Sequence, residues 1–145
     1  MHVADPWKSY RQISTLTAPP GQIILMLYDG ALRALERALP GFTHADPAEA
    51  NMIIHNNLLR AQAIIRELNY ALNMEQGGEC AATLRRLYDY FDRRIWDSNL
   101  RKRRDGVDEV IRLVTELRDA WAAMLNKPEP APEPTTTASL ALATA

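Results

Sequence analysis

Histidine and cysteine side chains can bind metals or act as nucleophiles, and this chain of 145 residues has only four of them: His2, His44, His55 and Cys80. Metal sites inside helical bundles commonly combine inward-facing glutamates with a Glu-x-x-His pair. Gly41 stands three residues before His44 and Met52 stands three residues before His55, so neither histidine completes such a pair. Neither Cys80 nor any serine has a neighbouring base and orienting group, and we expect Cys80 to pack as a small apolar residue. The sequence therefore predicts that the protein is not an enzyme and has no metal site and no cofactor.

Basic residues are concentrated between positions 85 and 104, where eight arginines and lysines outnumber three aspartates. Such a cluster could bind phosphate or an acidic partner, and Trp96 and nearby tyrosines could add stacking. The whole chain has a net charge of -1, which gives no general attraction for nucleic acid. Cations also favour the last turn of a helix. We expect a solvated helix face here, with a docking patch for an acidic partner as the alternative, and no nucleic acid as a partner.

The composition is typical of a single cytoplasmic domain. A chain of 145 residues is long enough to bury a core without metal or disulfide support. One cysteine cannot form an intrachain disulfide, and the first residues lack the basic start and apolar core of a signal peptide. No uncharged apolar run approaches the roughly 18 to 20 residues that span a bilayer. We therefore expect a cytosolic protein that does not insert into a membrane.

Hydrophobic spacing predicts a first helix from about residue 18, capped by Thr17, to Leu39, where Pro40-Gly41 stops it. Apolar residues at positions 23–28 extend nearly all the way around this helix. An ordinary surface helix has one apolar stripe and a polar opposite face. This helix is therefore either central in its bundle or has a face that awaits a partner.

A second helix is predicted to begin at Asp46, which can cap it, with Pro47 and Glu49 in its first turn. Its apolar residues recur at steps of three and four, as in a helix packed between antiparallel neighbours: Ile54, Leu58, Ala61, Ile65, Leu68 and Leu72. We expect it to end near Met74, with Gly77-Gly78 as the stop. The glycine pair lacks the Lys-Ser/Thr ending of a phosphate-binding loop.

Two more helices are predicted, from about Glu79 to Leu100 and from a cap at Asp105 to about residue 126. Four helices of similar length with short connections favour an all-α, antiparallel up-and-down four-helix bundle. Residues 17–126 form this domain. Residues 1–16 are expected to be a short mobile segment, and the Pro-, Ala- and Thr-rich residues 127–145 a disordered tail.

Several sequence fragments, in this order and spacing, resemble the flagellar secretion chaperone family FliS over residues 10–125. They are Tyr10-Arg11-Gln12, Thr17-Ala18-Pro19, Leu25-Met26-Leu27-Tyr28-Asp29-Gly30-Ala31, Gly77-Gly78-Glu79, the stretch 84–90, Ser98-Asn99-Leu100 and Leu117-Arg118-Asp119-Ala120-Trp121. The resemblance implies a bundle of four long antiparallel helices with a mobile N-terminal segment. That fold agrees with the periodicity.

The resemblance further implies a cytoplasmic chaperone that binds the C-terminal region of flagellin, which is disordered before filament assembly. Covering that region would prevent premature polymerisation and keep flagellin fit for type III secretion. The candidate binding residues lie in the N-terminal segment and on the first and third helices: Tyr10, Ile13, Leu27, Tyr28, Tyr88, Phe91, Ile95 and Trp96. For those on the helices, a core position fits the spacing equally well. We expect residues 7–16, with Tyr10, to cover a groove when it is empty.

Other interpretations remain open from sequence alone. A generic helical adaptor that binds another amphipathic helix would show the same surplus of apolar residues. The flagellar export gate and other flagellar regulators are further candidate partners, and the protein could be a monomer or a homodimer.

Overall fold

The structure is a computed structural model that describes residues 20–126, and this part of the chain is helical without a strand. Four α-helices follow one another: α2 (Pro20–Ala38), α3 (Pro47–Tyr70), α4 (Met74–Arg101) and α5 (Asp105–Leu125). A short 3-10 helix, η1 (Leu39–Thr43), joins α2 to α3. Thr17, the expected cap of the first helix, and the expected mobile segment and tail lie outside the described residues.

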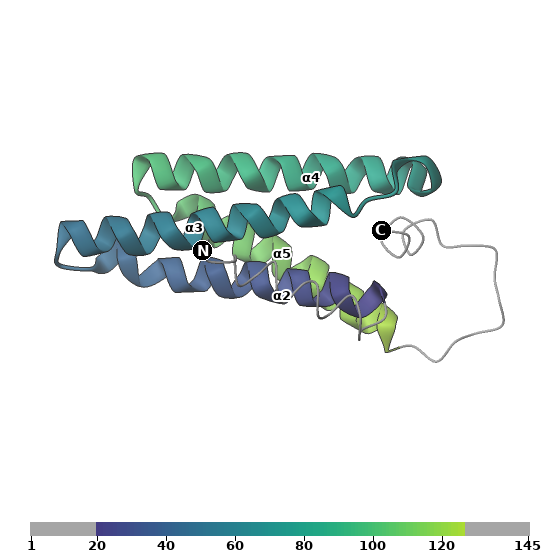
Figure 1. Cartoon of the computed structure of the whole chain (residues 1–145), viewed down its shortest axis with the longest axis horizontal. Helices are drawn as coiled ribbons and strands as arrows, with labels where there is room; N and C mark the ends of the chain where they lie inside the picture. The colour runs from purple at the N-terminus through teal and green to yellow at the C-terminus, as the bar shows by residue number, and fades with distance from the viewer. Residues whose placement is uncertain (1–19, 127–145) are drawn as a thin grey trace, which may run out of the picture.

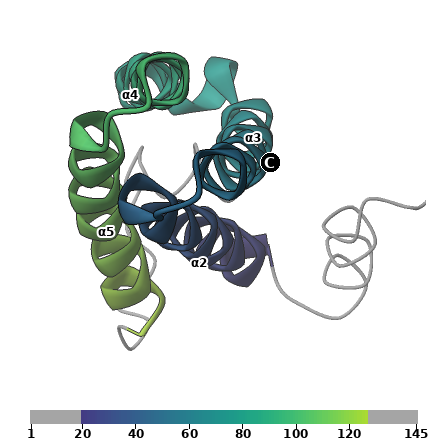
Figure 2. The same cartoon turned by 90° about the vertical axis from the view of Figure 1, so that its left-hand side faces the viewer.

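Each of the four helices packs against two others, so that α2 contacts α3 and α5, and α4 contacts α3 and α5. Consecutive helices run in opposite directions along the long axis, and α5 crosses the others obliquely (Figure 1). The end-on view shows the four helices arranged around a common centre (Figure 2). The prediction of an antiparallel up-and-down four-helix bundle is confirmed.

The core contains the whole apolar series predicted for the second helix. Leu58, Ala61 and Leu68 are completely buried, and Ile54, Ile65 and Leu72 are buried almost as fully. The helix begins as predicted, because the Asp46 carboxylate accepts a hydrogen bond from the Ala48 N–H at 3.1 Å. An N-cap residue of this kind satisfies a backbone donor that the helix itself cannot satisfy.

Two polar contacts between residues far apart in the sequence hold α2 against α5. The Trp121 indole N–H donates to the Gly21 carbonyl at 2.7 Å, and Arg118 forms an ion pair with Asp29 at 2.8 Å. Packing against two neighbouring helices accounts for the unusually apolar start of the first helix. With α3 and α5 both packed on it, Ile23 and Leu25 are partly buried beside the core.

The structure corrects the predicted boundary between the second and third helices. The second helix ends at Tyr70, and the third begins at Met74 instead of Glu79. The Asn73 side chain caps α4 by accepting from the Gln76 N–H at 2.9 Å. The glycine pair therefore lies inside α4, where Gly78 at φ 53 and ψ -132 makes a kink. Glycine adopts such a conformation without a Cβ clash, so it kinks the helix while Asn73 supplies the start.

The predicted cap of the last helix is also wrong. Asp105 is the first residue of α5, and the N-cap position is Arg104, whose side chain caps nothing. Asp105 and Asp108 instead lie in the first turn, where acidic side chains interact favourably with the helix dipole.

Candidate partner-binding surface

The structure places most of the predicted partner-binding residues in the core. Leu27, Tyr28, Tyr88, Phe91 and Ile95 are all at most 4% exposed. Trp96, in contrast, is 58% exposed. Tyr10 and Ile13 lie outside the described residues. Of the eight, Trp96 is therefore the one that the described structure presents to a partner.

Tyr28 and Tyr88 form a buried polar pair between α2 and α4. Their hydroxyl oxygens are 2.6 Å apart, and one hydroxyl donates a hydrogen bond to the other. Burial raises the pKa of Tyr28 to about 12 and the pKa of Tyr88 well above its ordinary value. The pair joins helices at opposite corners of the bundle, since α2 and α4 both lie between α3 and α5.

Replacing either tyrosine of this pair with phenylalanine should destabilise the bundle by about 1–3 kcal/mol, because the remaining hydroxyl loses its buried partner. The double variant Tyr28→Phe/Tyr88→Phe should cost less than the sum of the two single changes. Urea denaturation of all four proteins measures these free energies. Additive losses would contradict the coupling.

The same pair predicts a loss of stability at alkaline pH. An unfolded tyrosine loses its proton near pH 10, whereas folded Tyr28 keeps its proton to about 12. The unfolded state therefore binds fewer protons between these values, and the free energy of unfolding falls as pH rises. Urea denaturation at pH 8, 10 and 11 should show a smaller fall for the double phenylalanine variant. An equal fall would contradict this assignment.

Exposed large apolar side chains gather on the seam between α3 and α4. Met52 and Leu59 on α3 are 58% and 44% exposed, and Trp96 and Leu100 on α4 are 58% and 69% exposed. Residues three or four positions apart share a helix face, so Met52, His55 and Leu59 lie along one side of α3. A hydrogen bond between His55 Nδ1 and Asn99 Nδ2, at 3.1 Å, joins that side to α4. We call Met52, Leu59, Trp96 and Leu100 the α3–α4 patch.

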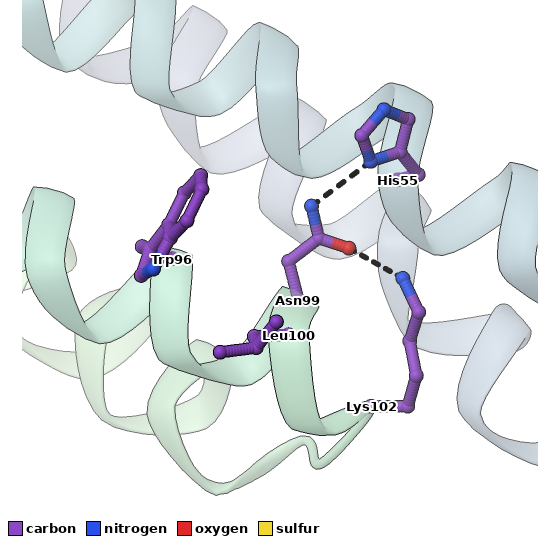
Figure 3. A pocket seen from close by; sticks show the side chains of 5 residues that line it. All are labelled: His55, Trp96, Asn99, Leu100 and Lys102. Atoms are coloured by element: carbon purple, nitrogen blue, oxygen red, sulfur yellow. Dashed lines mark hydrogen bonds between the residues drawn. The ribbon is translucent and has the colours of Figure 1, made fainter.

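A pocket of about 340 Å³ opens at this patch, lined by His55, Trp96, Asn99, Leu100 and Lys102. The Asn99 amide lies at its base, between the His55 ring and the end of the Lys102 side chain (Figure 3). The Lys102 ammonium donates to Asn99 Oδ1 at 2.5 Å. Trp96 and Leu100 form the apolar side of the pocket (Figure 3).

The rest of the α3–α4 seam is polar. Gln62 donates to the Asp92 carboxylate at 2.9 Å, and Arg66 forms an ion pair with the same group at 3.3 Å. Further along, Asn69 bonds to Asp89 at 3.0 Å and accepts from Arg85 at 3.1 Å. The α3–α4 patch is therefore bounded by polar side chains that bond to one another across the seam. This pattern suits the binding of the apolar side of another chain.

Comparison with known proteins identifies the family. The family model described as "Flagellar protein FliS" matches residues 3–128. The chain belongs to the FliS family. A flagellar secretion chaperone FliS of Bacillus subtilis is 37% identical over 121 residues, which cover 83% of this chain and 86% of the relative. The FliS of Salmonella typhimurium is 34% identical over 125 residues, covering 83% and 90%.

A third FliS relative, the flagellar secretion chaperone FliSB of Pseudomonas aeruginosa, is 31% identical over 125 residues and covers 83% of this chain and 96% of the relative. These matches confirm the resemblance read from the sequence fragments. In the described part of this FliS chain, no three His, Cys, Asp or Glu residues are placed to hold a metal ion. No helix among residues 20–126 is long and apolar enough to cross a bilayer.

Three members of the α3–α4 patch, Met52, Leu59 and Leu100, were missed by sequence reasoning about this FliS chain. Leu59 directly follows Leu58, which belongs to the buried apolar series of α3. An apolar residue outside the i, i+3, i+4 series of a helix lies on a different side of the helix from that series. That displacement from the periodic series is the signal that could have identified Leu59 and Met52.

Proposed function

We propose that this protein is a flagellar secretion chaperone that binds the C-terminal region of flagellin, prevents premature polymerisation and supports type III secretion. FliS family membership supports the flagellar secretion role. The observation that carries the binding proposal is the α3–α4 patch, where four large apolar side chains are exposed and two of them, Trp96 and Leu100, line a pocket. Location in the cytosol, and the export gate and other flagellar regulators as further partners, belong to the same proposal.

An amphipathic helix is the form of partner that this surface fits. Such a helix presents apolar side chains at positions i, i+3 or i+4, and i+7, and lays them into a groove between two helices. A disordered segment that folds on binding gives up about 2–5 kcal/mol in ordering and offsets it by burying apolar surface. Trp96 and Leu100, spaced by four residues, supply exposed area on α4, and Met52 and Leu59 supply it on α3.

Calorimetric titration with the C-terminal segment of the host's flagellin, at several temperatures, tests this function. We expect binding of one segment per chaperone with a clearly negative heat-capacity change, since apolar burial has that signature. Absence of binding would contradict the flagellin proposal. A generic adaptor for another amphipathic helix would then be the better interpretation, because the patch would still need an occupant.

The N-terminal residues belong to the same proposal. We infer that residues 7–16, including Tyr10 and Ile13, cover the apolar groove when it is empty and yield to flagellin. Its sequence has Trp7, Tyr10, Ile13 and Leu16 at spacings of three, which would align them along one side of a short helix. Either a monomer or a homodimer is compatible with an exposed patch of this kind.

A further inference from the structure

The basic run 101–104 is largely neutralised by its own neighbours. Its three arginines each form an ion pair with an aspartate: Arg101 with Asp97, Arg103 with Asp105, and Arg104 with Asp108. Lys102 is the exception within this run, because its ammonium group bonds to Asn99 and forms no ion pair with a carboxylate of residues 20–126. A polyanion such as nucleic acid binds through several free cations at once. Within the run 101–104, Lys102 alone is free of an ion pair, and a single ammonium group suits a single carboxylate.

Backbone geometry directs Lys102 toward the pocket. The residue ends α4 in the left-handed region, at φ 54 and ψ 48, and its ammonium reaches back to Asn99. Asn99 is 7% exposed and is fixed on its other side by His55. An ammonium group has three donors, and the bond to Asn99 uses one of them. Partial burial also lowers the pKa of Lys102, so an added negative charge would stabilise its protonated form.

The ammonium lies beside apolar groups that would hold a partner. Lys102, Trp96 and Leu100 line the same pocket (Figure 3). A helix that placed an apolar side chain against Leu100 could carry a carboxylate three or four residues away on the same side. An aspartate or glutamate can stand three or four residues from the apolar side chain anywhere in the docked helix. The terminal carboxylate can do so only if the end of the segment lies at the pocket.

We propose that Lys102 recognises an aspartate or glutamate side chain on the amphipathic helix that docks on the α3–α4 patch. This inference rests on the proposed function and adds a requirement to it: the bound segment carries an acidic residue one turn from an apolar anchor. Asn99 and His55 act as positioning residues that hold the ammonium at the pocket. Apolar burial supplies most of the affinity, and the charge pair selects the segment and its register.

The test compares Lys102→Gln with Arg103→Gln. Both substitutions remove one positive charge from the same loop, but Arg103 is paired with Asp105 and is not part of the pocket lining. Calorimetric titration with the amidated C-terminal segment of flagellin should show about five-fold weaker binding for Lys102→Gln and less than two-fold for Arg103→Gln. Lys102→Arg, which keeps the charge, should bind within about two-fold of the unaltered protein.

Variant peptides complete the experiment: each aspartate or glutamate of the segment is replaced in turn by asparagine or glutamine. One replacement should weaken binding to the unaltered protein by about five-fold. The same replacement should leave binding to the Lys102→Gln variant unchanged. Equal effects of Lys102→Gln and Arg103→Gln, or no sensitive acidic residue, would overturn the inference alone. Failure of the original segment to bind the unaltered protein would overturn the proposed function and, with it, the inference.

Discussion

Replacing Trp96 with alanine should weaken binding of the flagellin C-terminal segment by about 30-fold or more, with a melting temperature within about 2 °C of the unaltered protein. Tryptophans in the centre of an interface commonly contribute at least about 2 kcal/mol, which corresponds to this factor. Trp96 is 58% exposed, so its removal leaves no cavity in the bundle. Calorimetry measures the affinity, and thermal denaturation measures the stability.

Tyr70→Ala is the matched control for this experiment. Tyr70 is an aromatic side chain that is 80% exposed and lies at the opposite end of α3 from Met52. If flagellin bound through nonspecific hydrophobic interactions with exposed aromatic side chains, the two substitutions would weaken binding equally. A loss confined to Trp96→Ala supports the α3–α4 patch, and unchanged affinity of Trp96→Ala would contradict it.

The second large effect concerns stability. Leu58→Ala should lower the free energy of unfolding by about 2–5 kcal/mol, because a completely buried leucine leaves a cavity when truncated. Leu68→Ala, also completely buried, should cost a similar amount. Urea denaturation at neutral pH measures the change. A loss below about 1 kcal/mol for both variants would contradict the core assignment.

The neighbouring residue provides the control for Leu58. Leu59→Ala makes the same chemical change on the same helix, but Leu59 is 44% exposed and Leu58 is 0% exposed. We expect Leu59→Ala to change stability by less than about 1 kcal/mol and to weaken flagellin binding. Opposite effects of two adjacent leucines would separate the bundle's core from its binding surface in one experiment.

Tertiary contacts also give physical meaning to the fragments that resemble FliS. Asp29 belongs to one fragment and Arg118 to another, and the structure joins them in an ion pair at 2.8 Å. Tyr28, from the same fragment as Asp29, shares the buried hydrogen bond at 2.6 Å with Tyr88, from a third fragment. These residues therefore hold the helices of the bundle together. Sequence inspection assigned the tyrosines to a groove or a core without deciding between them.

The sequence by itself determined the number, direction and buried faces of the helices. Periodic spacing is a local property, and the series from Ile54 to Leu72 points to one side of the chain whatever that side contacts. Short connections then leave little choice but antiparallel neighbours. The start of the second helix at Asp46 could also be predicted from local sequence, because the capping side chain and the N–H that it accepts from are two residues apart.

The tertiary structure alone decided which surplus apolar groups lie inside and which remain exposed. Tyr28 is buried because α3 and α5 both pack on α2, and Trp96 stays exposed because no described helix covers the outer side of the α3–α4 seam. Neither outcome follows from one helix's spacing, since both depend on how many neighbours that helix has. The pairing of three arginines that leaves Lys102 without a carboxylate was decided in the same way, by geometry at the end of α4 and the start of α5.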